Sequence, residues 1–406
     1  MNKIKIIVMV TFIAVALQMI SVSPSTGIKA AELTDNEEDF VIKDGVLTKY
    51  VGVGGDVVVP DGVVAIDSYA FDCIGGRVDN VISVTLPDTV TSIGNGAFRR
   101  CKNLKSINMS DSVTSIGRDA FWGCEKLMEI SSLDGVKSIG SSAFGITPWL
   151  DERRKEDPIV VINGILIDGQ TCEGDVIIPN TVTTIVGSAF QSKELTSITI
   201  PDSVTDIGVT AFAGSRNLVT VKMADSVESV GEEAFRDCIK LKNVRLSNSL
   251  KVIEKWTFAN CRSLTQITIP YSVSKIDEIA FRGCKSLKYV TISYKITSAE
   301  SDVLSPSDKC PNITIYGLEK SYIQSYAKEN NIPFKPLAIA VTKKTLAVGD
   351  KYTLKMNSLA GCTWKSSNKS IATVDSYGKV TAKKKRKVTI TANLYGRCYQ
   401  CVVTIN

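Results

Sequence analysis

The residues that could carry chemistry in this 406-residue chain are cysteines and carboxylic acids, because the chain contains no histidine. That absence excludes Ser-His-Asp and Cys-His nucleophile systems, HExxH metal sites and histidine proton shuttles. The 42 Asp and Glu residues still allow a pair of carboxylates, which hydrolyses glycosidic bonds when the two groups lie about 5–9.5 Å apart. A carbohydrate-active enzyme that uses two carboxylates therefore stays open, although the enzyme class as a whole is not favoured.

Cysteines recur at one position of a repeated pattern, as Cys101, Cys124, Cys238, Cys261 and Cys284. In a protein from an oxidising compartment such cysteines suggest disulfides. However, equivalent residues on successive coils point the same way, whereas a disulfide needs Cβ vectors that approach each other. We therefore favour a buried ladder of free thiols. No spacing offers a compact set of four metal ligands, so we expect no metal site and no cofactor.

Aspartates share a second repeat position, at Asp88, Asp111, Asp202 and Asp225. Stacked carboxylates could hold calcium, but Asn248 and Tyr271 interrupt the series. We favour an Asx-type turn after each strand. Near the C-terminus, Cys398 and Cys401 mimic a CxxC motif, although residues three apart in a strand face opposite sides. A disulfide between Cys362 and Cys401 stays open as an alternative.

The cysteine and aspartate positions belong to a sequence unit that is repeated along the chain. The pair Ala-Phe, or Thr-Phe in one copy, ends at Phe71, Phe98, Phe121, Phe144, Phe190, Phe212, Phe235, Phe258 and Phe281. Most gaps are 23 residues, and the gap of 46 is twice that value. A unit of about 23 residues therefore repeats with one interruption, which is typical of a solenoid.

Each unit begins with a half-buried strand and then bends. Ile107 and Met109 alternate with polar residues, the pattern of a strand with one buried face. Val113 and Ile116 are both apolar but three apart, so the chain must bend between them, and we expect the following Gly117 to supply the freedom to turn. Stacked coils then bury a continuous core and align their strands in a long parallel sheet.

Two β-hairpins are predicted, one at the start of the array and one inside it. Asp44-Gly45 and Asn163-Gly164 stand between apolar runs, as in tight hairpin turns, so hairpin openings are expected near 41–60 and 160–179. The charged segment 147–158, within an insertion at 145–175, is predicted to be an exposed excursion. An amphipathic helix at 321–330, within a segment at 313–335, is expected to cap the array.

The two ends of the chain differ from the array. Residues 1–30 combine a basic start, a short apolar run and a small-residue exit, which is typical of a signal peptide; an uncleaved membrane anchor is the alternative. No second long apolar segment follows, so no membrane span is expected after cleavage, and the location should be secreted or extracellular, including the cell surface. Residues 336–406 contain short alternating strands separated by turn signals, as in a small β-sandwich.

Charge separates the same two regions. Residues 336–406 carry thirteen Lys and Arg against Asp350 and Asp375, a net charge of +11. The whole chain carries +6 and residues 1–30 carry three lysines and no acid, which leaves −8 for residues 31–335. The chain is therefore expected to form two domains, at 31–335 and 336–406.

These motifs resemble two known families. Residues of about 40 to 335 resemble the BspA-like leucine-rich-repeat family, with the best copies at 198–218 and 267–287. Residues 336–406 resemble the group 2 bacterial Ig-like domain, through Trp364-Lys365-Ser366-Ser367-Asn368 and Ile371-Ala372-Thr373-Val374. The resemblance implies a mainly β fold, in which a leucine-rich-repeat solenoid precedes an Ig-like sandwich, and a non-catalytic surface protein of interaction or adhesion.

The candidate binding surface is the outward face of the parallel sheet. Its predicted columns are Thr85, Asn108, Thr199, Lys222, Arg245, Thr268 and Thr291, beside Thr220, Asn243, Gln266 and Tyr289. Threonine is ordinary on an exposed strand, so the candidate ligand-binding residues are Lys222, Asn243, Arg245, Gln266 and Tyr289, since Arg and Tyr favour protein interfaces. We expect an extracellular or host-surface protein as partner. An architectural role or spacer in the envelope is the alternative, and the enzyme is the least favoured class.

A second partner is suggested by the run Lys383-Lys384-Lys385-Arg386-Lys387. Such a run resembles a nucleic-acid patch, but in an exported chain a solvated turn between two sandwich strands is favoured, and no nucleic acid is expected. A domain with this charge should instead be attracted to an anionic polymer of the cell envelope.

Overall fold

The computed structural model describes residues 37–71, 80–192, 194–292, 295–299, 303–304, 313–357, 362–394 and 397–406, all within the compact unit Asp35–Asn406. The predicted signal peptide at 1–30 lies outside these residues. In the described part of the chain, no helix is both long enough and apolar enough to cross a bilayer.

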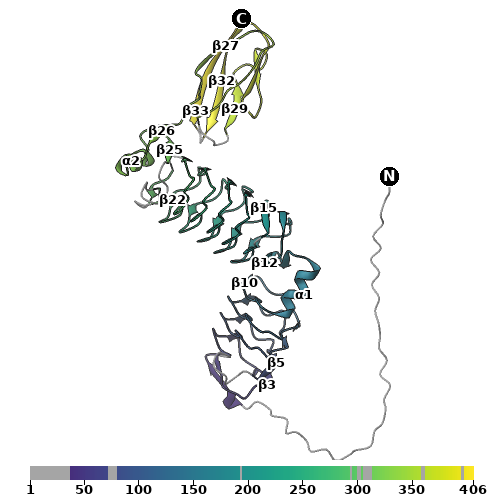
Figure 1. Ribbon diagram of the computed structural model, residues 1–406. Helices are drawn as coiled ribbons and strands as arrows, with labels where there is room; N and C mark the ends of the chain where they lie inside the picture. Colours follow the sequence, from purple (N-terminus) through teal and green to yellow (C-terminus); the bar gives the residue numbers. More distant parts are fainter. Residues whose placement is uncertain are drawn as a thin grey trace, which may run out of the picture. The chain divides into compact units, whose positions relative to one another are not determined.

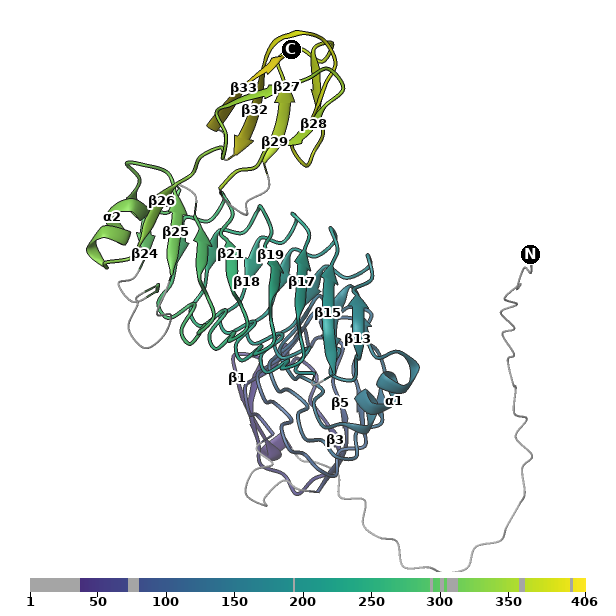
Figure 2. The same ribbon diagram turned by 45° about the horizontal axis from the view of Figure 1, so that its top comes forward.

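Along one side of the array the coils contribute strands, most of them of three residues or more, to three parallel sheets of four strands each, in which successive coils lie side by side (Figure 2). We call the exposed side of these strands the long-strand face. The strands are β3 (Gly55–Val58), β5 (Val81–Thr85), β7 (Ser106–Asn108) and β9 (Glu129–Ile130), then β13 (Gly174–Ile177), β15 (Leu195–Ile200), β17 (Thr220–Met223) and β19 (Asn243–Arg245), then β21 (Gln266–Thr268), β23 (Tyr289–Thr291), β25 (Thr314–Gly317) and β26 (Phe334–Pro336).

A second set of parallel strands lies on another side of each coil, and each of these strands has only two residues. We call their outer side the short-strand face. The strands are β4 (Ala65–Ile66), β6 (Ser92–Ile93), β8 (Ser115–Ile116), β10 (Ser138–Ile139), β14 (Thr184–Ile185), β16 (Asp206–Ile207), β18 (Ser229–Val230), β20 (Val252–Ile253), β22 (Lys275–Ile276) and β24 (Ser298–Ala299). The stacked coils are visible in Figure 1.

The phenylalanines of the repeat form two buried stacks, which confirms the shared interior predicted from the sequence. Each of the nine side chains is at most 2% exposed. In the second stack, Phe212 and Phe235 lie 5.0 Å apart between ring centroids, with an interplanar angle of 5°. In the first stack, Tyr50 extends the series at one end, 5.0 Å from Phe71. Burial of one ring per coil therefore provides a continuous apolar axis.

The turn around seven of the nine phenylalanines has left-handed backbone both two residues before and two residues after the ring. Asp119 and Gly123, two residues before and after Phe121, have φ values of 54° and 75°. By contrast, neither Gly117 nor Gly208, its equivalent in a later coil, has a positive φ, so the prediction that Gly117 supplies turning freedom was wrong. A Cβ at Gly117 would lie 2.6 Å from the backbone nitrogen of Asn95. These glycines are required because neighbouring coils approach closely there.

Two antiparallel hairpins begin the two runs of coils. Strand β1 (Phe40–Lys43) pairs with β2 (Val46–Tyr50), and β11 (Val160–Ile162) pairs with β12 (Ile165–Asp168). Asp44, Gly45, Asn163 and Gly164 all have positive φ, as a two-residue turn between twisted strands requires. A short 3₁₀ helix, η1 (Glu37–Asp39), precedes β1.

The segment 147–158 is exposed over most of its length, as its charges predicted, but its start is buried. It forms helix α1 (Pro148–Glu156), whose N-cap Thr147 accepts a hydrogen bond from the backbone N–H of Leu150. Trp149 and Leu150 are buried, and the Trp149 ring lies 4.7 Å from the ring of Phe144. The first turn of α1 thus covers the end of the first aromatic stack, while its charged residues face outward.

Helix α2 (Tyr322–Glu329) begins after Ser321 and lies beside β25 and β26. Its residues Ile323, Tyr326 and Ala327 are buried in the core of the array, as an amphipathic capping helix requires.

Residues 343–405 form two sheets with a common core. One sheet contains β27 (Lys343–Leu346), β33 (Arg397–Ile405), β32 (Arg386–Leu394) and β29 (Thr363–Ser366), and the other contains β28 (Lys351–Thr353), β31 (Lys379–Ala382) and β30 (Ala372–Val374). Val380 from one sheet and Ile390 from the other belong to the same buried cluster. The fold is therefore mainly β, a parallel solenoid followed by a small sandwich.

Candidate functional site

The five candidate residues all lie exposed on the long-strand face. Lys222 on β17 is in register with Arg245 on β19, and Thr220 is in register with Asn243. Gln266 on β21 is in register with Tyr289 on β23. Hydrogen bonding of the sheet is interrupted between β19 and β21, although the two strands lie next to each other. The structure thus brings the five residues together as two adjoining groups.

Arg245 is held in place by an aspartate of the preceding coil. Its Nη2 donates to Asp225 Oδ1 at 2.9 Å, and its Nη1 donates to the carbonyl oxygen of Met223. Asp225 also accepts bonds from the backbone and side chain of Asn248, at 3.2 and 3.0 Å. Burial alone would raise the pKa of Asp225, but the bonds from Asn248 and the charge of Arg245 outweigh it and lower the pKa. Asp225 is therefore a charged anchor for Arg245.

The face extends beyond the residues that the sequence indicated. The rings of Tyr289 and Tyr316 meet edge to face at 6.1 Å, and Lys335 Nζ lies 5.9 Å from the centre of the Tyr316 ring. Tyr316 is in register with Thr291, and Lys335 with Tyr316. Continuing the predicted columns into the next strand would have identified Tyr316.

At the other end of the same run, Asp175 and Ile177 on β13 were also missed. Ile177 is 73% exposed and lies in the column that continues through Thr199 to Lys222. Asp175 accepts hydrogen bonds from Ser197 at 2.6 Å and Thr196 at 2.8 Å. These two bonds, together with the charge of Lys222, lower the pKa of Asp175.

One predicted column residue is not exposed. Thr291 is only 1% exposed, although its strand position points outward. It lies in register with the bulky Tyr316 on the neighbouring strand, and a large ring beside a small side chain removes it from water. Thr291 is therefore not available to a partner.

The cysteine ladder is present, with one exception. Cys124, Cys238, Cys261 and Cys284 are free and buried, whereas Cys101 is disulfide-bonded, so the free-thiol prediction was wrong for Cys101. Each free thiol donates to the carbonyl oxygen of a phenylalanine in the preceding coil, as Cys124 does to Phe98 at 3.1 Å. Burial raises the pKa of Cys124 to about 12. These thiols are therefore unreactive and serve to satisfy buried carbonyl groups.

The remaining candidate cysteines are free, and the aspartate series is exposed. Cys362, Cys398 and Cys401 are all free, so the alternative of a Cys362–Cys401 disulfide was wrong, and Cys398 is exposed while Cys401 is buried. Asp88, Asp111, Asp202 and Asp225 are exposed at the ends of the long strands. Among the described residues, no group of three or more cysteines and acids is arranged to hold a metal ion.

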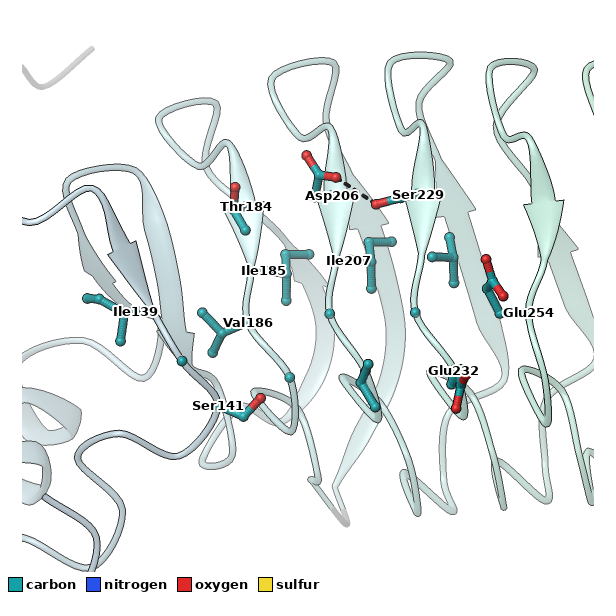
Figure 3. A pocket seen from close by; sticks show the side chains of 16 residues that line it. Ile139, Ser141, Thr184, Ile185, Val186, Asp206, Ile207, Ser229, Glu232 and Glu254 are labelled. Carbon is teal, nitrogen blue, oxygen red and sulfur yellow. Dashed lines mark hydrogen bonds between the residues drawn. The ribbon is translucent and has the colours of Figure 1, made fainter. Parts of the chain in front are cut away.

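A shallow groove crosses the short-strand face over β14, β16 and β18 (Figure 3). Ile185 and Ile207 lie along its floor, and Glu232 and Glu254 lie at the end opposite Ile139. Burial, together with the nearby charges of Asp277 and Glu232, raises the pKa of Glu254. The two glutamates belong to successive coils of one face, so they do not approach a bond from opposite sides as a hydrolytic pair does.

The stacked coils, the two sets of parallel strands and the central aromatic stacks define a leucine-rich-repeat solenoid. Residues 55–153, 172–273, 207–335 and 251–373 match the BspA type leucine rich repeat region, and the chain belongs to this family. The comparison with curated proteins finds no match.

Several solved structures are similar to the chain. A leucine rich cell surface protein from Faecalibacterium prausnitzii is 27% identical, covers 71% of this chain and 94% of its own, and has a TM-score of 0.32. A leucine-rich repeat protein from Bacteroides ovatus is 22% identical, with coverage of 73% and 97% and a TM-score of 0.34. The pneumococcal vaccine antigen PcpA is 17% identical, with coverage of 71% and 91% and a TM-score of 0.35.

Proposed function

We propose that this protein is a non-catalytic, exported binding protein that engages a protein partner through the long-strand face of its solenoid. One observation carries the proposal: Lys222, Asn243, Arg245, Gln266 and Tyr289 stand exposed on adjoining strands, while the residues that recur in every coil are buried. Regular burial accounts for the fold, so the non-repeating exposed residues are the ones free to serve recognition.

The chemistry of this face suits an acidic partner surface. Lys222, Arg245 and Lys335 lie on its strands, and the exposed Lys242 and Lys288 directly precede β19 and β23. Asp175 and Asp225 are acids on or beside the face, and Asp225 is bonded to Arg245. Tyr289 and Arg245 have the side-chain types that contribute most at protein interfaces. A basic, aromatic face on a domain of net negative charge favours one orientation of a partner during encounter.

Two other roles remain in competition. A purely architectural role requires no local cluster, whereas the charged and aromatic residues gather on the second run of coils. A carbohydrate-active enzyme requires two converging acids, whereas Glu232 and Glu254, which line the groove of the short-strand face, lie on successive coils of the same side. Their placement on one flat side favours the binding role.

Reversing charge on the face should abolish capture of the partner. We expect Lys222→Glu/Arg245→Glu to reduce retention of an extracellular matrix protein by about tenfold or more, because truncating an interface hot spot costs about 2 kcal/mol or more. Binding of purified matrix and cell-surface proteins would be compared by surface plasmon resonance. The control is Lys137→Glu/Lys251→Glu, which makes the same charge change at exposed lysines directly before β10 and β20. If both variants lost the same amount of binding, or if neither lost any, the long-strand face would not be the binding surface.

We also propose that residues 336–406 form a group 2 bacterial Ig-like domain and that residues 1–30 are a signal peptide. The motif beginning at Trp364 lies on β29, and Ala372, Thr373 and Val374 form β30, so the residues of the resemblance lie in the strands of the sandwich. The disulfide-bonded Cys101 is in keeping with an oxidising compartment.

The basic domain should hold the protein on an anionic envelope polymer. Lys383, Lys384 and Lys385 form the exposed turn between β31 and β32, where their charges can approach a polymer without burial. Retention of the full chain on isolated cell walls should fall steeply between 0.05 and about 0.5 M salt, since the Debye length shortens over this range. Lys383→Gln/Lys384→Gln/Lys385→Gln should elute at lower salt, and elution at the same salt as the unmodified chain would exclude this role for the turn.

A further inference from the structure

A cavity of about 440 Å³ lies where the first run of coils ends and the second begins. Its walls come from three places: Trp122 and Ile146 near the last phenylalanines of the first run, Asp151 and Arg154 on α1, and Gln170 and Gln191 on the first coil of the second run. No residue of the long-strand face between β17 and β23 lines it. The cavity is of a size that takes a small ligand.

The polar wall of this cavity is fixed before any ligand arrives. Arg154 donates from Nε to Asp168 Oδ1 at 2.9 Å and from Nη2 to Asp168 Oδ2 at 2.7 Å. Its Nη1 donates to Asp151 Oδ1 at 3.0 Å. Asp168 is 3% exposed at its side chain and also accepts from the backbone N–H of Gln170. Since a guanidinium has five N–H donors, these three bonds leave two donors of Arg154 for a ligand.

The aromatic wall is fixed as well. The guanidinium groups of Arg99 and Arg100 lie 5.1 and 5.3 Å from the centre of the Trp122 ring. Gly145, on the next coil, leaves room for the indole, because a Cβ there would lie 2.7 Å from Trp122 Cδ1. Trp122 therefore has contacts with the coil before it and the coil after it.

We propose that this cavity binds one neutral saccharide unit. Trp122 lines the cavity, and the part of its ring that the two guanidinium groups leave uncovered supplies apolar surface for the C–H groups of a sugar ring. Asp151, Arg154, Gln170 and Gln191 supply both donors and acceptors, which vicinal hydroxyl groups need in pairs. This is a different ligand class from the protein partner of the long-strand face, and it occupies a different place on the solenoid.

The charges in and around the cavity select against ionic ligands. Asp151 and Asp168 face a single Arg154, so the lining carries one net negative charge, which repels phosphate and carboxylate groups. The guanidinium groups of Arg99 and Arg100, which lie beside the Trp122 ring and outside the lining, add two positive charges that repel a cation. A neutral, hydroxyl-rich molecule avoids both penalties.

The test is nuclear magnetic resonance of the full chain with labelled tryptophan indoles and a panel of glucose, galactose, mannose, fucose and N-acetylglucosamine. We expect at least one sugar to shift the indole resonance of Trp122 while those of Trp149, Trp256 and Trp364 stay in place. Inorganic phosphate and N-acetyl-lysine methyl ester serve as anionic and cationic probes. Absence of a Trp122 shift with every sugar, or a larger shift with either charged probe, would overturn the proposal.

Two variants test whether the sugar binds in this cavity. Asp151→Asn and Gln191→Ala change exposed side chains, so the fold should be retained, and four unchanged indole resonances in the free variants will verify this. Each should weaken sugar binding by about fivefold or more, the effect of losing one hydrogen bond. Lys222→Glu/Arg245→Glu should bind the sugar as the unmodified chain does, so a failure of the protein-binding role leaves this result unaffected. Unaltered affinity in both cavity variants would refute the site.

Discussion

Replacing Phe235 by alanine should lower the free energy of unfolding by about 3–5 kcal/mol, the range for truncating a buried phenylalanine. Phe235 is fully buried, and its ring stacks on Phe212 at 5.0 Å and on Phe258 at 5.5 Å. Its removal leaves a cavity in the centre of the second stack, which the coils cannot close because backbone hydrogen bonds fix their spacing. Urea unfolding followed by circular dichroism would measure the change.

The matched control is Ile177→Ala, which truncates a large apolar side chain of the same solenoid that is 73% exposed. Since this side chain is already in water, its loss should change the free energy of unfolding by less than about 0.5 kcal/mol. If Phe235→Ala were as mild as the control, the aromatic stack would not be the main stabilising element of the array.

Replacing Arg154 by methionine should have an effect of similar size, a loss of about 3–5 kcal/mol, because it leaves the carboxylate of Asp168 buried without a counter-ion. The side chain of Asp168 is 3% exposed and that of Arg154 is 20% exposed. The pair joins α1 to β12, so its loss should loosen the connection between the two runs of coils. Thermal unfolding of the full chain at neutral pH would record the loss.

The double variant Arg154→Met/Asp168→Leu distinguishes a lost attraction from an unpaired charge. Exchange of a buried ion pair for apolar side chains is often neutral, so the double variant should recover most of the stability lost by Arg154→Met. A double variant as unstable as the single one would mean that the pair itself, rather than the isolated carboxylate, determines the stability of α1.

Periodicity allowed the sequence to predict the core of this fold. Nine phenylalanines in one phase require one environment, and all nine are buried. The two hairpins could be predicted because Asp44-Gly45 and Asn163-Gly164 are local signals that need no knowledge of distant residues. These features depend on spacing along the chain, which the sequence contains in full.

The features that the sequence could not predict depend on contacts between coils. The charges from Asp151 to Asp157 predicted the exposure of helix α1 but not the burial at its start, where Trp149 packs against Phe144. Thr291 was taken for an exposed residue because the neighbour that covers it, Tyr316, is 25 positions away. Gly117 was assigned to a turn because the approach of the preceding coil is not visible along the chain.

The candidate site likewise has features that the sequence could predict and contacts between coils that it could not. Exposure of Lys222, Arg245 and Tyr289 follows from alternation along a strand, which is a local property. The bond from Arg245 to Asp225 joins residues 20 apart, and the cavity beside Trp122 is assembled from segments up to 69 positions apart. To predict such groupings from the sequence, one must know which residues of successive coils lie side by side. The interruption of the repeat after Phe144 left this register undetermined.

The hydrogen bonds that join successive coils run along the stacking direction, as from Phe121 N to Ala143 O at 2.7 Å and from Phe235 N to Thr257 O at 2.9 Å. A tensile force along this direction therefore acts on the coils one after another and does not load them all together. In an optical trap the array should extend in small, nearly equal steps of roughly 70–80 Å, the contour length of about 23 residues. Such stepwise lengthening would let the solenoid extend under flow and limit the force that reaches its bound partner.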